Sequence, residues 1–93
     1  MTQKKNRRFV YLKREYLLER RKKLGLTQSV LAERSGFDVI AYNQIENGKL
    51  GNLMNAPKLV GLAQALEIPL ETLCEEEIVY LESLKSLNQK EEG

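Results

Sequence analysis

Apolar positions in this chain recur every three or four residues, which is the spacing of amphipathic α-helices. Glycine or proline interrupts the pattern at Gly25, Gly36, Gly48, Gly51 and Pro69. We therefore predict five helices, over about residues 13–24, 28–35, 39–47, a fourth entered at Pro57, and 70–87, followed by a polar tail that frays. The pattern contains no strand signal, so the chain should be all-α.

Polar residues that can cap a helix precede three of these segments, namely Thr27, Asp38 and Asn55. Gly36 follows the second segment and can adopt the left-handed conformation that a sharp turn requires. The positions predicted to face a common core are Leu17, Leu31, Ala32, Phe37, Tyr42 and Ile45, with Leu59, Val60, Leu62, Ala63 and Leu66 from the fourth helix. One modest core is what a chain of 93 residues can build.

Composition supports a folded protein, since 42% of the residues are hydrophobic and 30% are charged. Cys74 is the only cysteine and histidine is absent, so an intrachain disulfide is impossible and a zinc site of His and Cys is not expected. On its helix, Cys74 is better explained as a small buried residue than as a redox switch. No apolar run approaches a membrane span or resembles a signal peptide, so we expect a cytoplasmic protein without cofactors.

The net charge of +2 conceals an uneven distribution. Residues 1–49 contain twelve Lys and Arg against five Asp and Glu, whereas residues 50–93 contain three against eight. A basic half beside an acidic half is suited to orienting the molecule on a polyanion such as DNA, although a solvated charged surface would look the same.

Segment 24–49, LGLTQSVLAERSGFDVIAYNQIENGK, has two short helices joined by a tight turn, the spacing of a helix-turn-helix. Over roughly residues 13–74 the chain resembles the phage-repressor and Cro-like helix-turn-helix family, also called the XRE family. The matching positions are Arg21, Gly25-Leu26-Thr27-Gln28, Leu31-Ala32, Gly36, Ile45-Glu46, Gly48 and Leu62-Ala63-x-Ala65-Leu66. The resemblance implies a five-helix lambda-repressor-like domain that binds double-stranded DNA.

The resemblance also implies roles for individual residues. The base-reading positions are Val39, Ile40, Asn43 and Gln44, the phosphate contacts are Thr27, Gln28, Asn47 and Lys49, and Arg21 and Glu46 form a structural ion pair. Asn and Gln can bond adenine while Val and Ile contact only the thymine methyl, which favours an A·T-rich site. The resemblance further implies that Gln28 braces a side chain of the third helix in addition to its phosphate contact. Alternatively, Val39 and Ile40 belong to a protein interface, Gln28 is a solvated residue of the first turn, and the two charges of the ion pair are unpaired.

Several features depart from the family pattern. Val30 replaces an acidic residue that would complete a capping box, and Tyr42 replaces a smaller aliphatic, so that it shifts the third helix or carries its hydroxyl to the surface. The loop after the third helix is longer than usual, and its Leu50, Leu53 and Met54 either complete the core or form a contact patch.

Both ends of the chain extend beyond the matched region. Residues 1–12 form a basic arm and a short extended segment over 9–12; the arm, with Lys4, Lys5, Arg7 and Arg8, either contacts DNA or solubilises the chain. Residues 75–93 extend the last helix, whose Leu70, Leu73, Tyr80, Leu84 and Leu87 form a stripe interrupted at Glu77. That stripe either packs within the chain or pairs two copies as a homodimer.

The function favoured by these observations is sequence-specific binding of double-stranded DNA by a transcriptional regulator, with a repressor preferred over an activator. The alternative is a protein-interaction module, such as an antitoxin or adaptor, with the same fold. An enzyme is not expected, because the chain lacks histidine, a phosphate-binding glycine loop and a nucleophile paired with a base.

Overall fold

The helices follow the order that the hydrophobic pattern predicts, and the all-α class is confirmed. The structure is a computed structural model that describes residues 11–49 and 54–92, with side chains as far as Asn88. Its elements are α1 (Glu15–Lys23), α2 (Gln28–Ser35), α3 (Val39–Asn47), α4 (Ala56–Leu66) and α5 (Leu70–Glu92). Within the described ranges, no helix is long and apolar enough to cross a membrane.

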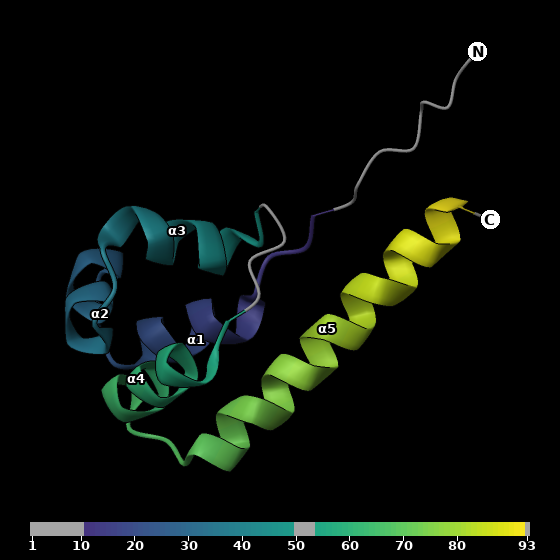
Figure 1. Ribbon diagram of the computed structural model, residues 1–93. Helices are drawn as coiled ribbons and strands as arrows, with labels where there is room; N and C mark the ends of the chain where they lie inside the picture. The colour runs from purple at the N-terminus through teal and green to yellow at the C-terminus, as the bar shows by residue number, and fades with distance from the viewer. Residues whose placement is uncertain (1–10, 50–53, 93) are drawn as a thin grey trace.

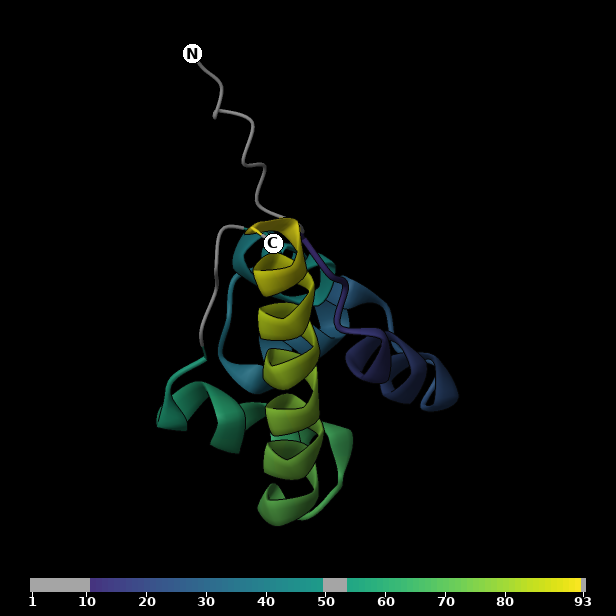
Figure 2. The ribbon, with the colours of Figure 1, turned by 90° about the vertical axis from the view of Figure 1, so that its right-hand side faces the viewer.

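The short helices α1 to α4 gather into one cluster, and the long helix α5 runs along its side (Figure 1). Helix α2 packs against both α3 and α4, α4 packs against α5, and α1 packs against α3. In the view turned by 90°, α5 stands in front of the cluster, with α4 on one side of it and α1 on the other (Figure 2). The C-terminal half of α5 extends away from the cluster (Figure 1).

Side-chain caps explain where three of the helices begin. Thr27, Asp38 and Asn55 each accept a hydrogen bond from the backbone N–H three residues ahead, at the starts of α2, α3 and α4 respectively. Helices α2 and α3 end at Gly36 and Gly48, which take left-handed φ angles of +82° and +68°. The caps predicted from the sequence are therefore confirmed.

The core lies where α1, α2, α3, α4 and the start of α5 meet. Its buried members are Leu17, Leu31, Ala32, Tyr42, Ile45, Leu62, Ala63, Ala65, Leu66 and Leu73, with Phe37, Met54 and Leu59 packed against them. Val60, which the pattern placed on the apolar stripe of α4, is instead 38% exposed. Of the two roles expected for the loop after α3, completing the core or forming a contact patch, Met54 takes the first. Leu50 and Leu53 lie outside the described residues.

Two helix ends differ from the sequence prediction. Helix α1 begins at Glu15 and not near Lys13, because the backbone N–H of Arg14 bonds the carbonyl of Glu46 instead of starting the helix. Helix α5 reaches Glu92, five residues beyond the predicted end at about Leu87. The prediction ended this helix where its apolar stripe ends, but no glycine or proline follows before residue 93 and the intervening residues are mostly compatible with a helix.

Two close approaches of the backbone fix how the helices pack. A Cβ built on Gly48 would lie 1.9 Å from the carbonyl oxygen of Leu12 and 2.9 Å from the hydroxyl of Tyr80. A Cβ on Gly61 would lie 2.4 Å from the carbonyl oxygen of Ser35, where α4 crosses the end of α2. Only glycine permits both approaches, so the position of α3 relative to the N-terminal segment and α5 depends on Gly48.

Candidate nucleic-acid interface

Helix α3 has two chemically different faces. Tyr42 and Ile45 are buried and hold the helix on the core, and Tyr42 packs edge-on against Phe37 at a centroid distance of 6.3 Å. On the outer face, Val39 and Ile40 are 42% and 69% exposed, while Asn43 and Gln44 are half-buried. The four positions predicted to read bases therefore lie together on the outer side of α3, within about one and a half turns.

The position of α3 against α2 depends on a small residue, Ala32, and on the tight turn around Gly36. Ala32 of α2 is 1% exposed in the core beside α3. The backbone N–H of Phe37 bonds the carbonyl of Ala32 at 2.9 Å, which closes the turn around Gly36. A larger side chain at position 32 would push α3 outward, because interiors packed at crystal-like density absorb little extra volume.

Arg21 of α1 and Glu46 of α3 form an ion pair with 2.9 Å between Nε and Oε2. Their side chains are only 11% and 6% exposed. Arg21 also donates to the carbonyl of Leu26 at 2.9 Å. This pair ties the first helix and the loop before α2 to the end of α3, as the sequence resemblance implies.

Glu46 also accepts hydrogen bonds from Tyr42, at 2.7 Å, and from the side-chain amide of Gln28. Burial raises the pKa of this carboxyl, but the hydrogen bonds from Arg21, Tyr42 and Gln28 outweigh burial and leave the pKa below its ordinary value of 4.5. Burial and the same carboxylate raise the pKa of Tyr42. Tyr42 is buried, so its hydroxyl lies inside the molecule. The expectation that this hydroxyl reaches the surface is therefore wrong.

The chain of hydrogen bonds continues from this ion pair to the outer face of α3. Asn43 donates to the side-chain oxygen of Gln28 at 3.1 Å, and Gln28 donates to Glu46. Asn47 donates to the backbone carbonyl of Asn43 at 3.0 Å, one turn earlier on α3. Gln28 thus braces α3 through Asn43 and is not a purely solvated residue of the first turn.

The remaining residues predicted to contact phosphate lie at the ends of helices. Thr27 is exposed at the start of α2, where its hydroxyl oxygen accepts from the N–H of Val30 at 3.2 Å. Lys49 is exposed and follows the end of α3 after Gly48. Free N–H groups and the helix dipole favour an anion near Thr27 and Gln28. The arm residues Lys4, Lys5, Arg7 and Arg8 lie outside the described residues.

A second buried network was not predicted from the sequence. Arg14 donates to both carboxylate oxygens of Glu77, at 2.9 and 2.8 Å, and to the carbonyl of Ile45 at 2.7 Å. Its guanidinium lies 4.3 Å from the ring centre of Tyr80, and Tyr16 donates to the same carboxylate. The interruption of the apolar stripe of α5 at Glu77 was the available signal, because a carboxylate on a buried stripe requires a cationic partner.

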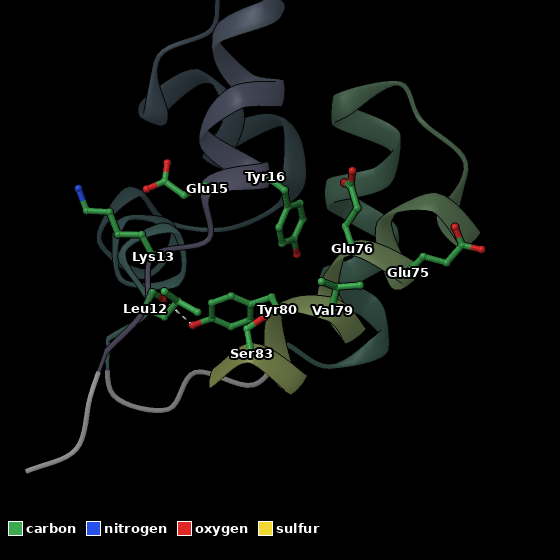
Figure 3. A pocket seen from close by; sticks show the side chains of 9 residues that line it. All are labelled: Leu12, Lys13, Glu15, Tyr16, Glu75, Glu76, Val79, Tyr80 and Ser83. Atoms are coloured by element: carbon green, nitrogen blue, oxygen red, sulfur yellow. Dashed lines mark hydrogen bonds between the residues drawn. The ribbon is translucent and has the colours of Figure 1, made fainter. Parts of the chain in front are cut away.

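A groove of about 400 Å³ lies beside this network, between α5 and the segment that leads into α1 (Figure 3). Its lining residues are Leu12, Lys13, Glu15, Tyr16, Glu75, Glu76, Val79, Tyr80 and Ser83. The side chain of Val79 is 61% exposed and its neighbour Ile78 is 54% exposed, so these two apolar side chains of α5 are left uncovered by residues 11–49 and 54–88. Tyr80 closes one end of the groove by donating to the carbonyl of Leu12 at 2.8 Å.

Comparisons with known proteins agree with this geometry. Residues 17–73, more than half of the chain, match the helix-turn-helix family. The cryptic phage CTXphi transcriptional repressor RstR of Vibrio cholerae serotype O1 is 29% identical over 87 residues, covering 85% of this chain and 76% of the relative. No solved structure gives a significant match.

The chain belongs to the helix-turn-helix family, and within it to the XRE and Cro-like group that the sequence resemblance indicated. It therefore carries a helix-turn-helix DNA-binding domain, and its five helices have the arrangement of the lambda-repressor-like fold. The motif itself is α2 and α3 with the turn around Gly36.

Proposed function

We propose that this protein is a sequence-specific regulator of transcription that binds double-stranded DNA and acts as a repressor. The observation that carries this proposal is the outer face of α3, where Val39, Ile40, Asn43 and Gln44 are presented together in a helix-turn-helix. In such motifs the second helix lies in the major groove and its exposed side chains contact base edges. The similarity to a phage transcriptional repressor supports the direction of regulation.

The chemistry of the four reading positions favours A·T base pairs. The amides of Asn43 and Gln44 can each donate to and accept from adenine, while Val39 and Ile40 can pack on thymine methyl groups. Packing on thymine methyls would also account for an Ile40 side chain that is 69% exposed in the free protein. We expect an operator in which A·T pairs occupy the positions facing α3.

Contacts to the DNA backbone would orient α3 in the groove. Thr27 and Gln28 lie at the start of α2, and Asn47 and Lys49 lie at the end of α3, next to the reading face in the sequence of the motif. The basic arm with Lys4, Lys5, Arg7 and Arg8 would add sequence-independent attraction to phosphate. Phosphate contacts set the register of the protein on DNA without contributing sequence information themselves.

We further propose that two copies pair through α5 on a palindromic operator. The exposed Ile78 and Val79 and the groove next to them provide apolar surface that the described part of the chain leaves uncovered. Two helix-turn-helix motifs in a dimer bind half-sites that are separated by about 34 Å, one turn of DNA. In this proposal the protein acts in the cytoplasm as a homodimer. It has no enzymatic activity and needs no cofactor.

The test is selection of bound duplexes from a random DNA pool, followed by titration of the selected duplex and a scrambled control at several salt concentrations. A repressor of this kind will enrich a palindrome with A·T pairs opposite α3, and its affinity will fall steeply with salt. Repression itself is measured with a reporter promoter that overlaps the selected site. Enrichment without repression would leave DNA binding intact and remove the assignment as a repressor.

A second candidate, a protein-interaction module, is favoured by the same exposed apolar side chains of α3 and α5. Val39 and Ile40 together with the groove beside α5 could hold a partner protein rather than DNA and a second copy. The selection distinguishes the two candidates, because a module of this kind would enrich no duplex and would bind DNA weakly with little dependence on sequence.

A further inference from the structure

A partly enclosed hollow of about 240 Å³ lies where α1, α2 and the end of α3 come together. It shares only Lys13 with the apolar groove of Figure 3 and is lined mostly by polar side chains. Its lining residues are Lys13, Arg14, Leu18, Arg21, Lys22, Gln28, Glu46 and Asn47. Two of these, Gln28 and Asn47, are residues for which the proposed function already requires phosphate contacts, whereas Lys13 and Lys22 have no role in it.

The fold neutralises only some of the charge in this hollow. Arg21 is paired with Glu46, and Arg14 is paired with Glu77. Lys13 and Lys22 are both exposed, and among residues 11–49 and 54–88 no carboxylate lies within ion-pair distance of either. Two lysines therefore line the hollow without an ion-pair partner from the described part of the fold.

Hydrogen-bond donors point to the same conclusion. The side-chain amide of Gln28 gives one of its two N–H bonds to Glu46, and that of Asn47 gives one to the carbonyl of Asn43. One N–H of each amide thus remains for a ligand, in addition to the ammonium groups of the two lysines. A site that offers several donors and a surplus of positive charge is suited to a tetrahedral oxyanion.

We propose that this hollow binds one phosphate group of the DNA backbone, with Lys13 and Lys22 as its two cationic residues. The inference rests on the proposed function and adds these two residues of the N-terminal segment and α1 to the interface. A water molecule occupies about 30 Å³ in the liquid, so 240 Å³ holds a phosphate group together with bridging waters.

The position of the hollow fits a backbone phosphate beside the reading helix. Asn47 lies four residues beyond Asn43 on α3, which is about 6 Å along the helix axis. Gln28 links the hollow directly to Asn43 through a hydrogen bond of 3.1 Å. A phosphate held here would lie at the edge of the major groove, which is about 12 Å wide, while Asn43 faces the bases. The contact would therefore fix how far α3 slides along the groove.

The test uses the full chain, the duplex obtained by selection, and the double variant K13Q/K22Q. The control variant is K23Q, which removes an exposed lysine of the same helix that does not line the hollow. Because all three lysines are exposed, each variant should fold, as checked by circular dichroism and thermal melting. Affinity is measured between 50 and 200 mM salt, and on duplexes in which single phosphates are replaced by neutral methylphosphonates.

If the two lysines share one phosphate, K13Q/K22Q lowers the slope of log affinity against log salt by about 1, and K23Q does so by much less. Between 50 and 200 mM salt, the wild-type protein should therefore lose about four times more affinity than K13Q/K22Q. One methylphosphonate per half-site should weaken the wild-type protein and leave K13Q/K22Q unaffected. That pattern would establish the subsite.

Other outcomes overturn the inference in distinguishable ways. Equal slopes for K13Q/K22Q and K23Q on a selected operator would remove the subsite while leaving the DNA-binding function in place. If the selection enriches no duplex, the proposed function itself fails. A titration with inorganic phosphate, followed by the NMR signals of the Gln28 and Asn47 side-chain amides, then shows whether the hollow takes a free anion, and such binding would replace the assignment to DNA.

Discussion

Arg14 and Glu77, which are 63 residues apart in the sequence, form a two-pronged ion pair inside the molecule. Their side chains are 1% and 7% exposed, and Arg14 also donates to the carbonyl of Ile45 near the end of α3. A single guanidinium therefore joins the segment before α1, the end of the reading helix and the middle of α5. The orientation of α5 relative to α3 depends on this pair.

Replacing Glu77 by Ala should lower the free energy of unfolding by about 3–5 kcal/mol, because it leaves the buried guanidinium of Arg14 without its counter-charge. Urea denaturation measures the loss. The exposed Glu75 on the same helix provides the control, since E75A should change stability by less than about 1 kcal/mol. Equal losses in the two variants would show that the ion pair does not hold α5 in place.

Stability should also depend on pH through Glu46. Its pKa is lowered in the fold below the ordinary value of 4.5, so the carboxylate contributes stability above about pH 4.5. This contribution is lost as the pH falls through the lowered pKa. At pH 7, E46Q should be less stable than wild type by about 3 kcal/mol, because Arg21 loses its partner. Denaturation at pH 7 and at pH 3 should show this difference shrinking in acid, and a difference independent of pH would contradict the assignment.

Gly48 and Gly36 offer a matched pair, since both have left-handed φ angles but only one is crowded. A Cβ at Gly36 would meet nothing within 4 Å, so G36A should cost only the backbone strain of about 1–2 kcal/mol. A Cβ at Gly48 would collide with the carbonyl of Leu12, so G48A should cost the same strain plus about 1–3 kcal/mol for the displaced backbone. Thermal melting of the two variants compares the costs directly.

Base preference should respond differently to the two amides of α3. Gln44→Ala should relax the preference at one operator position by about 1–3 kcal/mol and leave the fold intact. Asn43→Ala should relax a different position and also release Gln28 from its hydrogen bond, which weakens binding to every sequence. Repeating the duplex selection with each variant provides the measurement, and an unchanged preference would exclude that residue as a base contact.

The proposed dimer should be disrupted by charge on the exposed face of α5. The double variant I78E/V79E adds two carboxylates at side chains that are 54% and 61% exposed, so the subunit should stay folded and become a monomer by light scattering. Truncation after Cys74 is a poorer test, because it would also remove Glu77 and Tyr80, which hold Arg14 and Leu12. A dimer that persists in I78E/V79E would place the interface elsewhere.

Local signals in the sequence were sufficient for the helices and for the capping residues Thr27, Asp38 and Asn55, because caps and apolar spacing act within a few residues. The family resemblance also indicated the pairing of Arg21 with Glu46. The sequence could not indicate which cation would neutralise Glu77, since that choice depends on how α5 folds back along the cluster. Gly48 was recognised as a family position, but its contact with Leu12 and Tyr80 depends on segments that are distant in sequence.

The hydrogen bonds between Asn43, Gln28 and Glu46 have a consequence for how strictly α3 discriminates between bases. A side chain that is already held in one rotamer loses little conformational entropy on binding, whereas a free side chain loses about 0.5–1.5 kcal/mol. The held side chain of Asn43 also cannot readily adopt a second rotamer to suit a mismatched base. We therefore expect the base pair facing Asn43 to be the most invariant position of the operator, and the pair facing Gln44 to tolerate more variation and to contribute less to the residence time on DNA.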